Sequence, residues 1–87
     1  MYFKIKKRKA YFTIKRRDTV KNRIEAIRKE RGVRQEEFAK LMGVSRQTIS
    51  SLENGRYNPS ITLAYKIAKY FDMTIEEVFV FEEEDLK

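Results

Sequence analysis

The sequence predicts a mainly α domain of five short helices with a small β element. Apolar residues recur at helical spacing from Val20 onward. Residues that commonly begin or end helices divide this run into short pieces: Gly32, Gly43, Ser45, Asn54, Gly55, Ser60 and Thr74. At 87 residues, with 41% hydrophobic and 38% charged residues, the chain is expected to hold one small core.

The first helix is expected at residues 20–31, with Asp18 or Thr19 as its cap. Before it, residues 2–6 and 11–15 alternate apolar and polar side chains at strand spacing. No Gly, Asn or Pro marks a turn between these two pieces. This N-terminal stretch is therefore predicted either as a strand or hairpin or as a disordered segment.

Residues 35–54 have the spacing of a helix-turn-helix. Ala39 is small where two helix axes would approach, Gly43 suits the left-handed conformation that ends the first helix, and Ser45 can cap the second. The buried side chains are expected to be Phe38, Leu41, Val44, Ile49 and Leu52. The outward side chains are expected to be Arg46, Gln47, Thr48, Ser50 and Ser51. A second helix that exposes hydrogen-bonding groups suits the major groove of DNA.

A further helix is expected at residues 60–70, after the N-cap residue Ser60. Its inner face would be Ile61, Leu63, Ala64, Ile67 and Ala68 or Phe71. Thr74 and Glu77 have capping-box spacing, which predicts another short helix from Thr74. Residues 78–81 are all β-branched or aromatic, and we expect them to form a short strand.

Positive charge is concentrated at the N-terminus. Residues 1–17 carry eight Lys or Arg and no acid, whereas residues 18–81 carry eleven basic and nine acidic residues. Residues 82–87 carry one basic and four acidic residues. We therefore divide the chain into a basic N-terminal arm (1–17), a helix-turn-helix domain (18–81) and an acidic tail (82–87). The charge of the arm favours a polyanionic partner.

The chain has no Cys and no His. This composition removes disulfides, thiol chemistry, the usual zinc ligands and the usual general base, so we expect no enzyme, no metal site and no cofactor. No apolar run approaches the roughly 20 residues that span a bilayer, and charges interrupt the apolar residues near the N-terminus. A cytoplasmic protein is expected, and no small-molecule effector is evident.

Residues 20–81 resemble the Cro and phage-repressor type of helix-turn-helix, the XRE family. The resemblance covers the segments RIEAIRKERGVRQEEFAKLMGVSRQTISSLENGRYNPSITLAYKIAKYF and TIEEVF. It implies a five-helix, lambda-repressor-like domain, usually dimeric, that binds an operator and regulates transcription. Small members sometimes pair a strand after the last helix with a strand before the first. Residues 19–21 or part of the arm would supply that partner strand here.

The resemblance also assigns roles to individual positions. The base-reading positions match Arg46, Gln47 and Ser51. The positions that usually meet the DNA backbone match Gln35, Thr48, Asn54 and Arg56. The chemistry agrees, because Arg can donate two hydrogen bonds to guanine and Gln can pair with adenine in the same way. Further candidates for phosphate contact are Arg34, which replaces the usual N-cap residue before Gln35, and the arm residues Lys7, Arg8 and Lys9.

Two more groups have expected structural roles. Arg28 and Glu53 match positions where a buried ion pair orients the recognition helix in the family. A cluster of large apolar residues near the C-terminus predicts a two-fold interface, although the same residues would also serve to close the core of the monomer. This cluster consists of Phe71, Met73, Ile75, Val78, Phe79 and Phe81.

The expected function is that of a homodimeric, sequence-specific regulator, most simply a repressor that occludes a promoter. Two copies of the helix at 45–53 would enter successive major grooves of a palindromic operator in double-stranded DNA, about 34 Å apart. An alternative is an antitoxin or adaptor that uses the fold mainly to hold a protein partner. For the arm, contact with DNA, a dimerisation strand and a disordered tail all remain open. No membrane partner is expected, and the rival hypothesis that the interleaved Tyr, Phe and Lys of the arm attach it to an anionic membrane surface is kept third.

Overall fold

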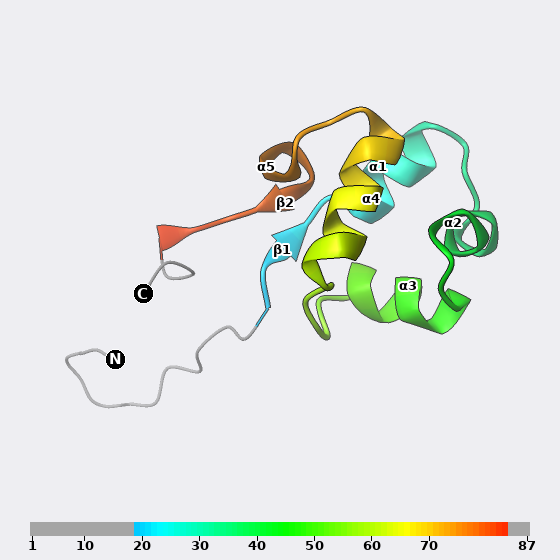
Figure 1. Ribbon diagram of the computed structural model, residues 1–87, viewed down its shortest axis with the longest axis horizontal. Helices are drawn as coiled ribbons and strands as arrows, with labels where there is room; N and C mark the ends of the chain where they lie inside the picture. Colours follow the sequence, from blue (N-terminus) through cyan, green and yellow to red (C-terminus); the bar gives the residue numbers. More distant parts are fainter. Residues whose placement is uncertain (1–18, 84–87) are drawn as a thin grey trace.

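Five helices and a two-stranded antiparallel ribbon form the part of the chain that the structure, a computed structural model, describes: residues 19–83 (Figure 1). In chain order the elements are β1 (Lys21–Asn22), α1 (Ile24–Glu30), α2 (Gln35–Met42), α3 (Arg46–Glu53), α4 (Ile61–Phe71), α5 (Ile75–Val78) and β2 (Phe79–Val80). The expected fold class, mainly α with a small β element, is confirmed. Within these residues no helix is both long and apolar enough to cross a bilayer.

Local capping chemistry explains where three of the helices begin. The Ser45 hydroxyl accepts a hydrogen bond from the Thr48 backbone N–H at 3.0 Å, and Ser60 caps α4 in the same way. Thr74 forms a complete capping box with Glu77 at the start of α5. Each cap satisfies a backbone N–H that has no partner inside its helix.

The predicted start of the first helix is wrong. Helix α1 begins at Ile24, four residues later than Val20, because the residues before it pair with the C-terminal strand. Thr19 caps no helix, since its hydroxyl donates to the Gly55 carbonyl at 2.7 Å. The side chain of Asn22 instead accepts a hydrogen bond from the backbone N–H of Ile24 at 3.1 Å.

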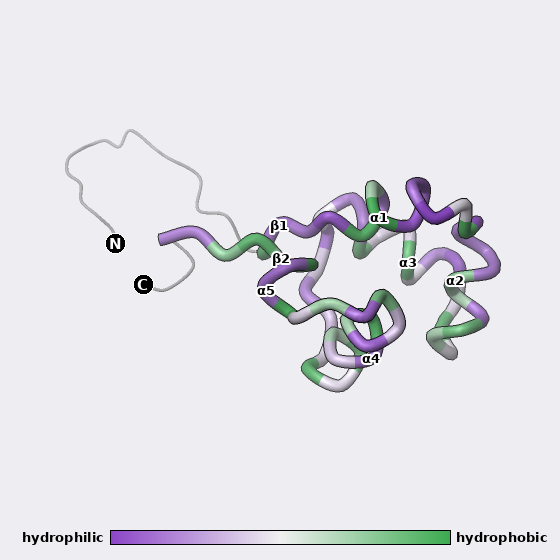
Figure 2. The backbone as a smooth tube through the Cα atoms, turned by 90° about the horizontal axis from the view of Figure 1, so that it is seen from above, coloured by the Kyte–Doolittle hydropathy of each residue, from purple (hydrophilic) through white to green (hydrophobic). Residues whose placement is uncertain are grey.

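The ribbon joins the two ends of the described domain. Lys21 pairs with Val80 and Asn22 with Phe79. The partner strand thus precedes α1, as the family resemblance implies, but it includes Asn22, and Val78 belongs to α5 rather than to the strand. Figure 2 places this apolar C-terminal segment at the opposite end of the domain from α2.

One contiguous core holds α1 to α5 together. Phe38 and Phe71 stack at its centre with their ring centroids 5.3 Å apart. Two predicted core residues are exposed instead, Leu41 by 50% and Ile61 by 83%. The buried stripe of α2 runs through Phe38, Ala39 and Met42, so Leu41 falls at its margin, whereas Ile61 is the first residue of α4 and lies beyond the core.

Candidate DNA-binding surface

Helices α2 and α3 form the helix-turn-helix. Gly43 ends α2 with a φ of +76°, in the left-handed region, and α3 begins three residues later, at Arg46. Helix α3 buries Ile49 and Leu52 and leaves its other side exposed or partly exposed. That side carries the three candidate base-reading residues, Arg46, Gln47 and Ser51.

A buried ion pair fixes α3 against α1. Arg28 donates from Nε to Glu53 Oε2 at 2.8 Å and from Nη2 to Oε1 at 3.2 Å. Both side chains are almost fully buried, with exposures of 7% and 2%. The hydrogen bond to Glu53 raises the pKa of Arg28 above its ordinary value, despite the opposing effect of burial. A third bond, from Arg28 Nη1 to the Val33 carbonyl at 2.9 Å, extends the network to the segment before α2.

Gln35 extends this network to the exposed surface. Its Nε2 donates to Glu53 Oε1 at 3.1 Å, and its Oε1 accepts from Arg46 Nε at 3.2 Å. A carboxylate can only accept hydrogen bonds, so Glu53 requires the amide nitrogen of Gln35 to face it. The amide oxygen is then left facing Arg46. The hydrogen bond to Glu53 thus turns the amide oxygen of Gln35 toward Arg46.

The guanidinium of Arg46 is therefore held along one edge only. Its Nε is bonded to Gln35, whereas Nη1 and Nη2 make no hydrogen bond with any residue between 19 and 83. Those two nitrogens form the fork that matches O6 and N7 of guanine. The sequence predicts a phosphate contact for Gln35 but not its hydrogen bond with Arg46. That bond forms because α2 and α3 lie close together in the fold.

Thr48 takes part in the local cap of α3. Its hydroxyl lies 2.9 Å from the Ser45 hydroxyl, and its backbone N–H donates to the same oxygen. The two expected roles, a helix-start hydrogen bond and a DNA contact, are not exclusive, because a hydroxyl has one donor and two acceptor sites. In this structure the local hydrogen bond is formed.

The remaining candidates lie directly after α3 and at the start of α2. Asn54 and Arg56 are exposed, and the Arg56 backbone N–H donates to the Ser51 carbonyl at 2.9 Å. Arg34 is also exposed, at the N-terminus of α2, and its side chain makes no cap hydrogen bond. The arm residues Lys7, Arg8 and Lys9 lie outside the described residues.

The N-terminal segment 19–22 is bonded to the end of α3 and to its following loop. Thr19 donates to the Gly55 carbonyl at 2.7 Å, Val20 N–H donates to Asn58 Oδ1 at 2.8 Å, and Asn22 Nδ2 donates to the Leu52 carbonyl at 3.0 Å. These contacts join residues that are 30 to 38 positions apart in the sequence. Nothing in the sequence of this polar segment indicates hydrogen bonds to residues so far along the chain. These contacts were therefore not predicted.

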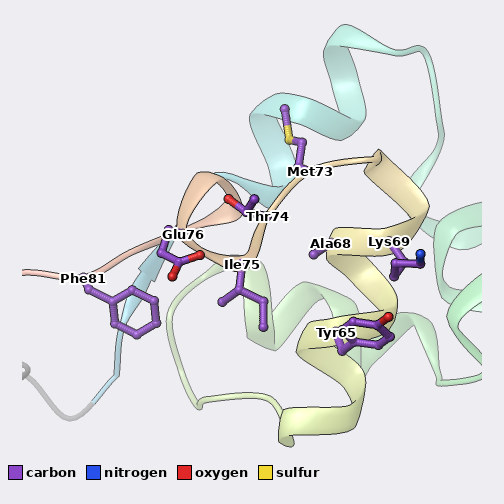
Figure 3. Close-up of a pocket in the computed structure, with 8 residues that line it drawn as sticks. All are labelled: Tyr65, Ala68, Lys69, Met73, Thr74, Ile75, Glu76 and Phe81. Carbon is purple, nitrogen blue, oxygen red and sulfur yellow. The ribbon is translucent and has the colours of Figure 1, made fainter.

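The predicted interface cluster is split by the structure. Phe71 and Val78 are fully buried and Phe79 is 3% exposed, so these three close the monomer core and are not available to a partner at the surface. Phe81 is 48% exposed. It borders an open groove of about 380 Å³ together with Tyr65, Ala68, Lys69, Met73, Thr74, Ile75 and Glu76 (Figure 3).

Comparison with known proteins assigns the family. A model described as helix-turn-helix matches residues 24–78. A protein from Archaeoglobus fulgidus, named as an uncharacterized HTH-type transcriptional regulator, is 51% identical over 67 residues, covering 77% of this chain and 96% of that protein. One of the same description from Methanocaldococcus jannaschii is 46% identical over 66 residues, covering 76% of this chain and all of that protein.

A solved structure has a similar fold. The restriction-modification controller protein C.AhdI from Aeromonas hydrophila is 31% identical and superposes with a TM-score of 0.58, over 63% of this chain and 83% of that one. The fold of this chain, its helix-turn-helix and the descriptions of these relatives all indicate the same family. The chain belongs to the Cro and phage-repressor type (XRE) helix-turn-helix family and is a DNA-binding transcriptional regulator rather than an enzyme.

Proposed function

We propose that the protein is a sequence-specific, homodimeric repressor that acts in the cytoplasm and places α3 in the major groove of a palindromic operator. The observation that carries this proposal is the guanidinium of Arg46, whose Nε donates to Gln35 at 3.2 Å and whose Nη1 and Nη2 have no partner within residues 19–83. A pre-positioned donor pair loses little side-chain freedom on binding. The proposed base contacts are made by Arg46, Gln47 and Ser51.

Other residues at the same surface have the chemistry for phosphate contact. Backbone N–H groups, amides, hydroxyls and cations commonly fix a protein on the duplex without reading its sequence. The proposed backbone contacts are made by Gln35, Thr48, Asn54 and Arg56, with Arg34 as a further cation. Gln35 uses one N–H of its amide for Glu53, so its second N–H and its backbone N–H remain for a phosphate.

The groove beside Phe81 is the proposed dimer surface, and its occupant is a second copy of this chain. Apolar atoms of Tyr65, Ile75 and Phe81 are accessible there, and the groove is lined by one cation, Lys69, and one anion, Glu76 (Figure 3). A two-fold axis brings the same patch of two copies together. Because Lys69 and Glu76 carry opposite charges, an axis that brings Lys69 of one copy beside Glu76 of the other makes the patch complementary to itself in charge.

Replacing Phe81 by Ser should shift the protein from dimer to monomer, because it removes an exposed apolar group from the interface without opening the core. Sedimentation over a range of concentrations measures the dissociation constant, which we expect to rise at least about tenfold for the loss of an aromatic anchor. Leu41→Ser is the matched control, since Leu41 is 50% and Phe81 48% exposed and Leu41 lies outside the groove. Equal weakening by both substitutions would exclude this surface as the interface.

Selection of bound duplexes from a random pool tests the function itself. The expected product is a palindromic motif with half-sites about 10 base pairs, or about 34 Å, apart. A complete promoter fragment carrying that motif should then lose transcription when the protein is added. Recovery of no motif, together with a stable complex with another protein, would contradict the proposal and favour an antitoxin or adaptor.

A further inference from the structure

Arg56 is a candidate phosphate-contacting residue whose position depends on its backbone. It is exposed, and its side chain makes no hydrogen bond or ion pair with any residue from 19 to 83. Arg46, by contrast, is oriented through its side chain by Gln35. The point from which Arg56 can reach a DNA phosphate is therefore set by the loop that carries it, residues 54–60 between α3 and α4.

The first residues of this loop are bonded back to α3. The Gly55 backbone N–H donates to the Leu52 carbonyl at 3.1 Å, and that of Arg56 donates to the Ser51 carbonyl at 2.9 Å. These bonds hold the start of the loop to the last turn of the recognition helix. Beyond Arg56, the side chain of Tyr57 packs against the core.

The N-terminal segment 19–22 bonds the loop from a different part of the domain. Thr19 Oγ1 donates to the Gly55 carbonyl at 2.7 Å, and the Val20 backbone N–H donates to Asn58 Oδ1 at 2.8 Å. Gly55 directly precedes Arg56 in the chain, and Asn58 follows it by two residues. The segment therefore holds the loop at two points, one on each side of the cation.

The segment is itself held in place by Asn22. Asn22 Nδ2 donates to the Leu52 carbonyl at 3.0 Å, and Oδ1 accepts from the Ile24 backbone N–H at 3.1 Å. A carbonyl only accepts and a backbone N–H only donates, so these partners determine the orientation of the amide. Asn22 also pairs with Phe79 in the ribbon. The segment thus connects the loop to α1 and to the C-terminal strand as well as to α3.

We propose that Thr19 is a positioning residue for DNA binding, which acts through the Gly55 carbonyl to place Arg56 against a duplex phosphate. This inference rests on the proposed function and adds to it a residue outside the helix-turn-helix, since the family model begins only at residue 24. Groups that are already in place lose less conformational freedom when they bind. The bond from Thr19 orders the backbone next to Arg56 in the free protein, so less ordering remains for the complex.

Thr19→Val tests the proposal, because it removes the hydroxyl bonded to Gly55 and nearly preserves side-chain size. The packing of Tyr57 on the core is untouched, and the full chain should stay folded. Affinity for the selected operator and for an unrelated duplex should fall by the same factor, about two- to tenfold, the range expected for ordering one mobile side chain. The factors should be equal because phosphate contacts carry no sequence information.

Two further variants separate positioning from general weakening of the fold. Thr19→Ser keeps the hydroxyl and should restore most of the affinity. Thr62→Val is the matched control, since it makes the same substitution at an exposed position of α4 to which no DNA contact is assigned, and it should leave the affinity unchanged.

The double variant decides whether Thr19 acts through Arg56. In the Arg56→Ala background, adding Thr19→Val should weaken binding no further, since the residue that it positions is absent. An equal loss in both backgrounds would overturn the proposal, because it would mean that Thr19 supports binding by another route. An affinity of the Thr19→Val single variant equal to that of the unsubstituted chain would also overturn it.

Amide hydrogen exchange in the free full-length chain measures the effect on the loop without DNA. Thr19→Val should speed exchange at Gly55 and Arg56 and leave buried Ile49 on α3 unchanged. Unchanged exchange in the loop would show that Thr19 does not hold it, contrary to the proposal. If the unsubstituted chain binds no duplex selectively, the proposed function fails and this inference fails with it. If that chain binds selectively and Thr19→Val has no effect, only this inference fails.

Discussion

Replacing Arg28 by Met is expected to lower the free energy of unfolding by about 3–5 kcal/mol, because it leaves a buried carboxylate without its charged partner. Glu53 accepts two hydrogen bonds from Arg28 and is 2% exposed. Water cannot replace those donors unless the packing of α1 on α3 opens. The remaining donor, Gln35, is neutral and compensates only in part.

Chemical denaturation followed by circular dichroism measures this loss, with the two-state model checked by the constancy of the denaturant slope. The double variant Arg28→Met with Glu53→Leu is the control, because replacing both members of a buried pair by apolar groups is often close to neutral. The double variant should recover most of the stability. A single variant that loses less than about 1 kcal/mol would mean that the carboxylate finds solvent, and that the pair does not determine the position of α3.

Local signals in the sequence were sufficient to predict most helices. Each N-cap side chain accepts a hydrogen bond from a backbone N–H only three residues further on, as seen for Ser45, Ser60 and Thr74. Gly43 ends α2 through its own backbone conformation. Local signals did not predict the start of α1, because it is displaced by the ribbon, which pairs residue 22 with residue 79. No property of residues 18–22 alone indicates that partner.

At the C-terminus, too, the sequence alone does not distinguish buried residues from exposed ones. Phe79 and Phe81 are identical in type and two positions apart, yet one is 3% and the other 48% exposed. Phe79 lies in the ribbon and faces the core, whereas Phe81 lies beyond the last paired residue. Composition predicted an apolar cluster at this end of the chain but could not separate the residues that close the core from those left at the surface.

The outward position of the candidate base-reading side chains was predicted, but the hydrogen bond that orients Arg46 was not. The spacing of the helix-turn-helix indicates that Arg46 and Gln47 face outward, as they do. The bond from Arg46 to Gln35 joins two helices through a side-chain amide whose orientation depends on Glu53. That orientation follows from hydrogen-bonding rules only after the three side chains are placed together.

Arg46→Ala should cost about 1–3 kcal/mol at one base position and relax the preference there, because in the proposed complex the residue donates two parallel hydrogen bonds to guanine. Arg56→Ala should instead weaken all duplexes similarly and reduce the salt slope by about 1, as expected for a phosphate contact. Binding to the selected operator and to its single-base variants measures both effects. The same uniform loss for the two substitutions would contradict the assigned roles.

Gln35→Met separates positioning from base contact in this experiment. Methionine cannot accept the hydrogen bond from Arg46 Nε as Gln35 does, so the guanidinium loses its fixed orientation while its charge stays near the groove. We expect part of the preference for guanine to disappear and the salt slope to remain the same. In the Arg46→Ala background the added Gln35→Met should change the base preference no further, since Gln35 acts there only through Arg46. An equal loss of preference in both backgrounds would show that Gln35 contacts a base directly, in addition to its proposed phosphate contact, and that the network from Arg28 through Glu53 serves stability but not recognition.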